Sequence, residues 1–263
     1  MEARPPRATR LTRARTEALF RRLAHHTALD EDEQAALAGV LDDERAFEAG
    51  AVIVERGDYV KTAFAVTDGW AARTITLGDG RRQIVNFMLP GDLFDLQVFA
   101  GEPADHTVRA LTAVRLATVS RETLLAVVHG ASALSGALWW ASVREEAVLR
   151  EQVVRNGRRS AKERVAHLLL ELHYRLRAIG AAEPDGFDLP VGQAALSDAL
   201  GLSYVHVSRV LTWLEGEGLV SRSRGRVELS DRAGLEALCD FSSLYLLGEA
   251  GAARAESRAG EVS

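Results

Sequence analysis

Hydrophobic and polar positions between about residues 46 and 120 alternate in short runs that are typical of β-strands. The runs are rich in Val, Ile, Thr and Phe, and glycines at 57, 69, 80 and 91 separate them at intervals of 11 or 12 residues. Regular turns at this spacing indicate an antiparallel sandwich or barrel. The stretch LGDGRR at 77–82 predicts a tight hairpin, because Asp-Gly accepts the positive φ angles of two-residue turns.

The apolar pattern then changes to a helical period. Residues 122–156 contain no proline, and their apolar side chains form two stripes on one long helix. One stripe holds Leu134, Leu138, Ala141 and Val148, and the other holds Trp140, Val143, Ala147 and Val154. A helix that is apolar on two sides is normally buried on two sides. Such a helix either packs on its own domain while pairing with a second copy, or lies buried inside a monomer.

A second helical pattern lies nearer the C-terminus and predicts a helix-turn-helix. A short apolar-periodic helix ends at Gly201, where glycine can adopt the left-handed cap. Ser203 can cap the helix that follows. The apolar positions of this second helix obey the i, i+3, i+4, i+7 rule and are Val207, Val210, Leu211 and Leu214.

The stretch LVSRSRGRVEL at 219–229 follows directly and alternates around Arg224-Gly225. This pattern predicts a β-hairpin with Arg222, Arg224 and Arg226 on or near one face. Two helices separated by a three-residue gap and followed by such a hairpin form a winged helix-turn-helix. The sequence therefore predicts a DNA-binding domain.

The charge of the whole chain does not favour DNA binding, but the charge of one local stretch does. The net charge of −5 provides no global attraction to nucleic acid, so DNA binding would rest on basic patches. One such patch is residues 155–177, with seven Lys or Arg against two Glu. Apolar runs are far shorter than the ~20 residues of a membrane span, so no membrane association is expected. The single cysteine, Cys239, argues against a disulfide or four-cysteine cluster and for the reducing cytoplasm, with no cofactor expected.

The second helix of the motif presents one polar face opposite its apolar stripe. Arg209 on this face can bond both O6 and N7 of guanine. Ser208 and His206 can donate to a base or a phosphate, and Val205 can cover a thymine methyl group. The candidate DNA contacts on this helix and the wing are Ser203, Tyr204, Val205, His206, Ser208, Arg209, Thr212, Arg222, Arg224 and Arg226.

Taken in order, these features resemble the Crp/Fnr family of bacterial transcription regulators over about residues 20–235. The likeness includes the PGD turn at 90–92, RSAKERVAHLLLEL at 159–172 and LEGEGLV at 214–220. It implies an α+β fold with an N-terminal cyclic-nucleotide-binding-like β-roll (a jelly roll), a long dimerisation helix and a C-terminal winged helix-turn-helix. It also implies a homodimer on a palindromic operator in double-stranded DNA, with RNA polymerase as a further partner.

The resemblance divides the chain into five segments. We expect a disordered basic arm at 1–20, the roll sensor domain at 21–131 and the dimerisation helix at 132–157. The winged domain follows at 158–235, and a C-terminal tail occupies 236–263. Many family members carry a Glu where Val205 stands, and that Glu accepts a bond from cytosine, so the usual operator half-sites are not expected here.

The effector pocket of the roll departs from the family pattern. In members that bind cyclic AMP, the GD turn continues into a Gly-Glu whose carboxylate holds the ribose, and an Arg-Ser pair holds the phosphate. Asp95 and Leu96 stand at the Gly-Glu positions, and Ala104 and Asp105 at the Arg-Ser positions. A cyclic phosphate would meet an aspartate and no guanidinium, and like charges repel. The candidate pocket residues are Gly91, Asp92, Asp95, Leu96, Asp105 and His106, with the effector unknown.

Two functions of other classes stand as alternatives at this point. The first is a sensor or adaptor module with a cyclic-nucleotide-like roll that binds no DNA. The second is an enzyme, because Asp92 and Asp95 lie close in sequence, but no nucleophile, metal set or base converges on them. We therefore expect a regulator and not an enzyme.

Overall fold

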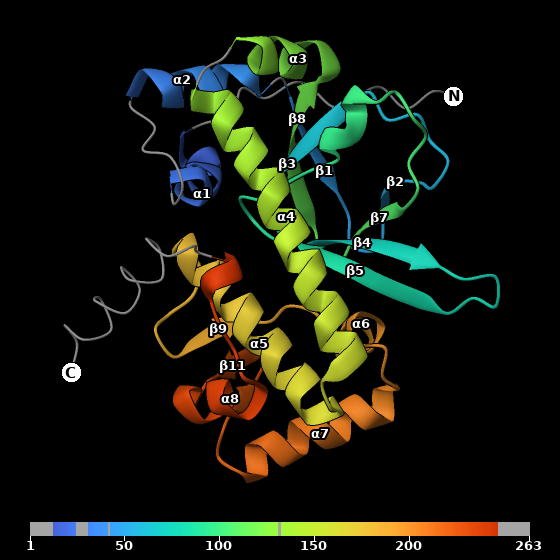
Figure 1. Ribbon diagram of the computed structural model, residues 1–263, viewed down its shortest axis with the longest axis vertical. Coiled ribbons are helices and arrows are strands. Elements are labelled where there is room, and N and C mark those ends of the chain that lie inside the picture. Colours follow the sequence, from blue (N-terminus) through green and yellow to red (C-terminus); the bar gives the residue numbers. More distant parts are fainter. Residues whose placement is uncertain (1–12, 25–30, 42, 131–132, 247–263) are drawn as a thin grey trace. The chain divides into compact units, whose positions relative to one another are not determined.

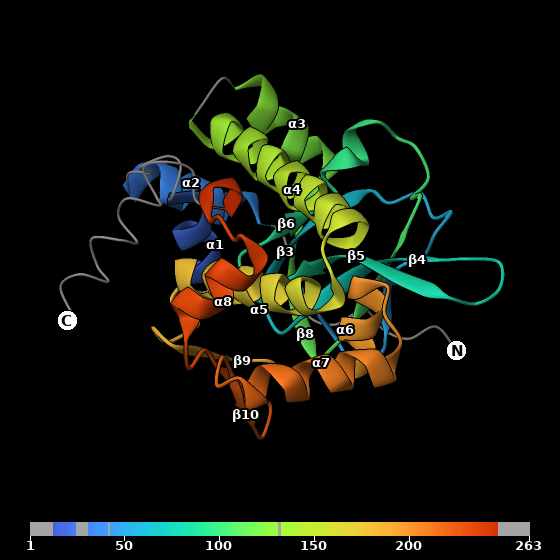
Figure 2. The same cartoon turned by 60° about the horizontal axis from the view of Figure 1, so that its bottom comes forward.

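The computed structural model describes residues 13–24, 31–41, 43–130 and 133–246 (Figures 1 and 2). The chain divides into two compact units. The first contains the described residues up to Thr74 together with Phe87–Ser142, and the second contains Ile75–Asn86 together with the described residues from Val143 onward. The tip of the 77–82 hairpin, expected to belong to the roll domain, is therefore part of the second unit.

Most of the first unit is a β-roll of two four-stranded sheets, of which the end of β4 and most of β5 belong to the second unit. One sheet has the order β1 (Glu44–Phe47), β8 (Val114–Ser120), β3 (Thr62–Asp68), β6 (Leu93–Phe94). The other has the order β2 (Val52–Val54), β7 (Thr107–Ala110), β4 (Ala71–Thr76), β5 (Arg82–Met88). The four regularly spaced glycines all have positive φ and all lie in turns between strands, which confirms the expected glycine-punctuated roll.

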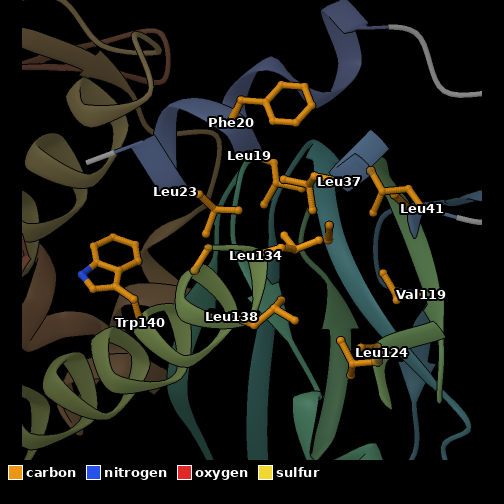
Figure 3. Packing of buried hydrophobic residues seen from close by; sticks show 14 of the residues in the cluster. Leu19, Phe20, Leu23, Leu37, Leu41, Val119, Leu124, Leu134, Leu138 and Trp140 are labelled. Carbon is orange, nitrogen blue, oxygen red and sulfur yellow. The ribbon is translucent and has the colours of Figure 1, made fainter. Parts of the chain in front are cut away.

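Helices cover one sheet of the roll and complete its core. These are α1 (Arg13–Ala24), α2 (Glu31–Val40), α3 (Arg121–His129), the 3₁₀ turn η1 (Leu96–Phe99) and the first turns of α4 (Ala133–Arg158). Figure 3 shows leucines from four of these helices converging on β3 and β8, with Leu23 and Leu124 fully buried. The strands contribute alanines there, such as Ala63 and Ala117, so the helices can approach the sheet closely.

The basic arm expected at 1–20 is folded from Arg13 onward. Thr16, Leu19 and Phe20 of α1 are buried against the roll, at spacings that place them on one face of the helix. This part of the expectation was wrong because the arginines on either side of these positions, at 13, 15, 21 and 22, obscure a short amphipathic pattern. Residues 1–12 lie outside the described part of the chain.

The second unit is a winged helix-turn-helix built on the end of α4. It contains α5 (Ala161–Ala178), β9 (Gly186–Asp188), α6 (Gln193–Leu200), α7 (Tyr204–Gly216), β10 (Ser221–Ser223), β11 (Arg226–Glu228) and α8 (Arg232–Cys239). The three strands form a sheet in the order β10-β11-β9. Gly201 has φ 63° between α6 and α7, as the predicted left-handed cap requires.

The expected tail at 236–263 begins inside folded structure. Residues 236–239 complete α8, whose Leu235 and Cys239 are buried. The following residues pack on the same unit as far as Leu246, which lies against Val148 of α4. Residues 247–263 lie outside the described part of the chain.

The long helix α4 confirms one predicted stripe and corrects the other. Leu134, Leu138 and Val148 are buried within their own chain, but so are Trp140 and Ala147 of the second stripe. The exposed positions of α4 are Gly136, Trp139, Val143, Glu146, Arg150, Val153, Val154, Gly157 and Arg158, and all but Val154 and Arg158 follow steps of three and four residues. Val143 and Val154 of the second predicted stripe are among them. Among the described residues, no single helix is long and apolar enough to cross a membrane. Helix α3 and residues Leu134–Arg158 together have the length and composition of a membrane span, but the two helices are bent by 111° relative to each other.

Helix α5 buries an unusual number of polar side chains. Arg155 of α4 donates to Glu171 at 3.0 Å, and both side chains are almost fully buried. His167 and His173 are also buried, and this burial lowers the pKa of His167 to about 3 and that of His173 to about 4. Both imidazoles are therefore neutral in the folded protein at physiological pH.

These two histidines predict loss of stability in mild acid. The unfolded chain binds their protons below the ordinary pKa of about 6.5, whereas the folded chain does not until near pH 4. The free energy of unfolding therefore falls as pH drops from 6.5 toward 4, by ~2 kcal/mol per histidine at pH 5. Urea titrations at several pH values measure this, and His173→Gln should remove about half of the slope. An unchanged slope in this variant would contradict the assignment.

Candidate DNA-binding interface and effector pocket

Helix α7 is held by its apolar side and presents its polar side to solvent. Val207, Val210, Leu211 and Leu214 are buried, as predicted. The Ser203 hydroxyl caps the helix by accepting from the His206 backbone N–H. This bond uses the hydroxyl as an acceptor, so its hydrogen can still be donated to a phosphate.

The opposite face of α7 carries the predicted contact residues. Val205 is 56% exposed and Tyr204 58%, and the side chains of His206, Arg209 and Thr212 are also exposed. Ser208 is half-buried. An exposed helix face of this kind can enter a major groove, where an arginine can reach base edges.

A cation–π contact ties this helix to the domain. The Lys162 Nζ lies 3.5 Å from the centre of the Trp213 ring, which joins α5 to α7. Lys162 belongs to the basic stretch 155–177, whose charges are largely used inside the protein. Arg155 and Arg175 are buried beside Glu171, and Arg159 pairs with Glu151 at 2.6 Å. The stretch therefore serves mainly to hold the domain together. Only the exposed basic side chains of the predicted patch remain available for phosphate contacts.

The wing forms as predicted, but its three arginines do not share one face. Arg222 lies opposite Val227 in the hairpin, and Ser223 lies opposite Arg226. Directly opposed residues share a face and successive residues alternate, so Arg222 and Arg226 point to opposite sides of the hairpin. The alternation in the sequence was right, but the two-residue turn at Arg224-Gly225 shifts the second strand out of phase with the first.

The same two arginines are engaged within the protein. Arg222 makes two bonds to Glu215 of α7, at 2.7 and 3.0 Å. Arg226 pairs with Glu183 and lies within 4 Å of Glu228. Arg224, at the tip with φ 49°, is exposed. Within the described residues, Arg209 and Arg224 are the candidate arginines that no intramolecular acid neutralises.

The PGD turn of the roll is covered by α1. Gly91 has φ 85°, and a Cβ there would lie 2.6 Å from the Ala18 carbonyl oxygen. Asp92 accepts from the Leu89 backbone N–H at 2.7 Å and lies 3.2 Å from Arg22 Nε. The turn thus holds a helix of its own chain, and glycine is required by both its backbone angle and the close approach.

A buried ionic cluster fills the region predicted to hold the effector. Asp95 is 1% exposed, has φ 57° and accepts from Arg73 of β4 at 3.1 Å. Its Oδ1 also lies 2.9 Å from His106 Nε2, while His106 Nδ1 lies 2.6 Å from Asp105. The hydrogen bond to His106 holds the pKa of Asp105 below its usual value. The positive φ of Asp95 is a strained conformation, and the cluster offsets that strain.

Arg73 is the residue that the sequence analysis missed. A guanidinium does reach the predicted phosphate region, but it comes from β4 and is bonded to Asp95. The available signal was an arginine within a strand whose other residues are uncharged. At an inward position of such a strand, a buried charge requires a partner. Leu96 packs with the apolar core, and Ala104 is buried, so neither position can ligate a polar group.

The carboxylates considered for catalysis are used structurally. Asp92 holds α1 and its own turn, and Asp95 is paired with Arg73. Among the described residues, no group of three or more His, Cys, Asp or Glu side chains is placed to hold a metal ion.

Comparison with known proteins identifies the class. A family model described as a cyclic nucleotide-binding domain matches residues 44–130, and one described as a Crp-like helix-turn-helix domain matches residues 163–238. The nitrogen fixation regulation protein FixK of Azorhizobium caulinodans is 33% identical over 218 residues, covering 82% of this chain and 87% of FixK. The transcriptional activator protein FnrL of Cereibacter sphaeroides is 30% identical over 184 residues, covering 67% of this chain and 72% of FnrL.

Among solved structures, FixK2 from Bradyrhizobium japonicum is similar with a TM-score of 0.69 and 27% identity, covering 76% of this chain and 98% of FixK2. The fold and the two sites thus define a two-part transcription regulator, with a cyclic-nucleotide-binding-type roll and a winged helix-turn-helix. The chain belongs to the Crp/Fnr family, and it is a DNA-binding regulator of that type.

Proposed function

We propose that the protein is a homodimer that reads a two-fold symmetric operator through α7 and the wing tip, and that its roll does not respond to cyclic nucleotides. The observation that carries the proposal is the exposed face of α7, where Arg209 stands free of internal acids beside Val205. A regulator that binds operator DNA acts in the cytoplasm, so we place the protein there. We also infer that RNA polymerase is a further partner. Selection of DNA from a random-sequence pool by mobility shift tests this, and failure to select any sequence would favour a sensor or adaptor that binds no DNA.

The exposed stripe of α4 supports pairing with a second copy. Its positions alternate in steps of three and four, which is the spacing of the seam in a two-stranded coiled coil. Trp139 and Val153 are 74% and 73% exposed, so both leave apolar surface for a partner to cover. Glu146 and Arg150 interrupt the apolar stripe with opposite charges, and such a polar layer can set the register of two identical helices.

The dimer predicts which substitutions separate the subunits. Val153→Asp places a charge in the seam at an exposed position, so the subunit should stay folded while the dimer dissociates and operator affinity is lost. Sedimentation at micromolar concentration measures the mass. Val128→Asp on α3, where Val128 is 43% exposed, is the matched control and should remain dimeric. A wild-type monomer that binds one half-site as tightly as a palindrome would contradict the proposal.

The free arginines predict two kinds of DNA contact. Arg209→Ala should weaken the selected operator by ~1–3 kcal/mol and random DNA much less, because a guanine contact is lost. Arg224→Ala should weaken both DNAs alike and reduce the slope of log affinity against log salt by about one, because a phosphate contact is lost. Quantitative mobility shifts over a salt series measure both effects. Equal losses on both DNAs for Arg209→Ala would show that it contacts only phosphate.

The cluster in the roll predicts no response to cyclic AMP or cyclic GMP. The guanidinium that could hold a phosphate is bonded to buried Asp95, and releasing it would leave that carboxylate without its cationic partner. Calorimetric titration of both nucleotides should show no binding at physiological concentrations. A dissociation constant below about 50 µM, or a nucleotide-dependent gain in operator affinity, would overturn this part of the proposal.

A further inference from the structure

The segment that follows α8 folds back on the junction between α4 and α5. We call residues 241–246 the C-terminal clamp; they are the last described residues of the red ribbon in Figure 1. Arg144 of α4 donates to the carbonyl oxygens of Leu244 and Tyr245, at 3.2 and 2.7 Å. Leu246 packs with Val148, one turn further along the same helix. The clamp is therefore fastened to α4 by its backbone and by one apolar side chain.

The aromatic side chains of the clamp contact α5. The Phe241 ring stacks on Tyr174 at 5.2 Å between centroids and lies 5.0 Å from the ring of His167. The Tyr245 hydroxyl donates to Glu171 Oε2 at 2.8 Å. The same Glu171 oxygen accepts from Arg155 of α4 at 3.0 Å. One buried carboxylate thus connects α4, α5 and the clamp.

The covalent connection between the two helices provides little stiffness of its own. Helix α4 ends at Arg158 and α5 begins at Ala161, so only two residues join them, and Gly157 lies in the last turn of α4. Glycine permits a wide range of backbone angles and fills no space at this turn. The angle between the helices is therefore determined mainly by side chains that bridge them. These include Arg155 with Glu171, Glu151 with His167 at 3.1 Å, and the clamp.

We propose that Tyr245 and Arg144 are positioning residues for operator binding, because the clamp fixes the angle between the helix that carries the dimer seam and the helix on which the winged domain is built. This inference rests on the proposed dimer. Two recognition helices must lie about 34 Å apart to enter successive major grooves on one side of the duplex. A clamp that holds the α4–α5 angle presets this distance, so the second half-site binds with little additional ordering.

Protonation states at the joint agree with this role. Burial raises the pKa of Tyr245 well above its ordinary value, while the nearby guanidinium of Arg155 holds the pKa of Glu171 below its ordinary value despite burial. The phenol remains a donor and the carboxylate an acceptor across physiological pH. The hydrogen bond that closes the clamp is therefore constantly available.

Tyr245→Phe tests the inference because it removes one hydroxyl and keeps the ring. Affinity should be measured for the selected palindrome and for a duplex with a single half-site. The palindrome affinity should fall about tenfold, the half-site affinity should stay within twofold, and the sedimenting mass should stay that of the dimer. Arg144→Gln should act in the same direction. Leu244→Ala is the matched control, because this exposed side chain is lost while its carbonyl remains.

The outcomes distinguish a role of Tyr245 in positioning the two winged domains from a role in stabilising each domain. Equal losses on palindrome and half-site would show that Tyr245 only stabilises the winged domain, and this would overturn the inference, as would no loss on either. A second readout uses palindromes lengthened by one base pair between the half-sites, which the wild type should reject more strongly than Tyr245→Phe does. A wild type with no preference for the palindrome would instead contradict the proposed dimer and the clamp together.

Discussion

The ion pair between Arg155 and Glu171 is the interaction on which the DNA-binding half of the molecule depends. Both side chains are almost fully buried, and an ion removed from water costs several kcal/mol unless a partner replaces its hydration. Separating α4 from α5 would remove the partner of buried Arg155 and would leave Glu171 with Arg175 of its own helix, 3.8 Å away. A specific arrangement of the two helices is therefore favoured by electrostatics, and neutral His167 and the Tyr245 hydroxyl add hydrogen bonds to the pair.

The roll also contains buried charges that pair with each other, and there the pairing occupies a predicted ligand site. Asp95, Arg73 and His106 form a buried cluster in the region that the sequence predicted to hold an effector. An internal carboxylate thus takes the guanidinium that an external phosphate would need. The neighbouring PGD turn is occupied by α1 through Arg22 and Asp92. The fold of a ligand-binding domain is kept while its buried aspartate and arginine pair with each other, and among the described residues the Asp95 Oδ2 and Arg73 Nε atoms have no hydrogen-bond partner.

Internal pairing also shapes the DNA-binding surface. The chain is acidic overall, and acids of its own winged domain engage Arg222 and Arg226. These pairs orient the wing against α7 and β9 while removing positive charge from the surface. Arg209 and Arg224 keep theirs, one on the recognition helix and one at the wing tip. Non-specific attraction to DNA is thereby limited, and a larger share of the affinity can come from base contacts.

Much of the architecture followed from the sequence because periodicity and turn chemistry are local. The glycine spacing predicted the roll, and the helix–Gly201–Ser203–helix pattern predicted the helix-turn-helix with its buried face. The partners of buried polar and charged side chains could not be predicted from local sequence, because the partners are far apart along the chain. Arg73 and Asp95 are 22 residues apart, and Tyr245 and Glu171 are 74 residues apart. Likewise, the predicted second stripe of α4 was only partly exposed, because Trp140 and Ala147 are buried within their own chain whereas Val143 and Val154 are exposed. The sequence by itself determined the elements and their apolar faces, whereas only the tertiary structure decided which cations remain free, since neutralising a charge requires a partner brought close by folding.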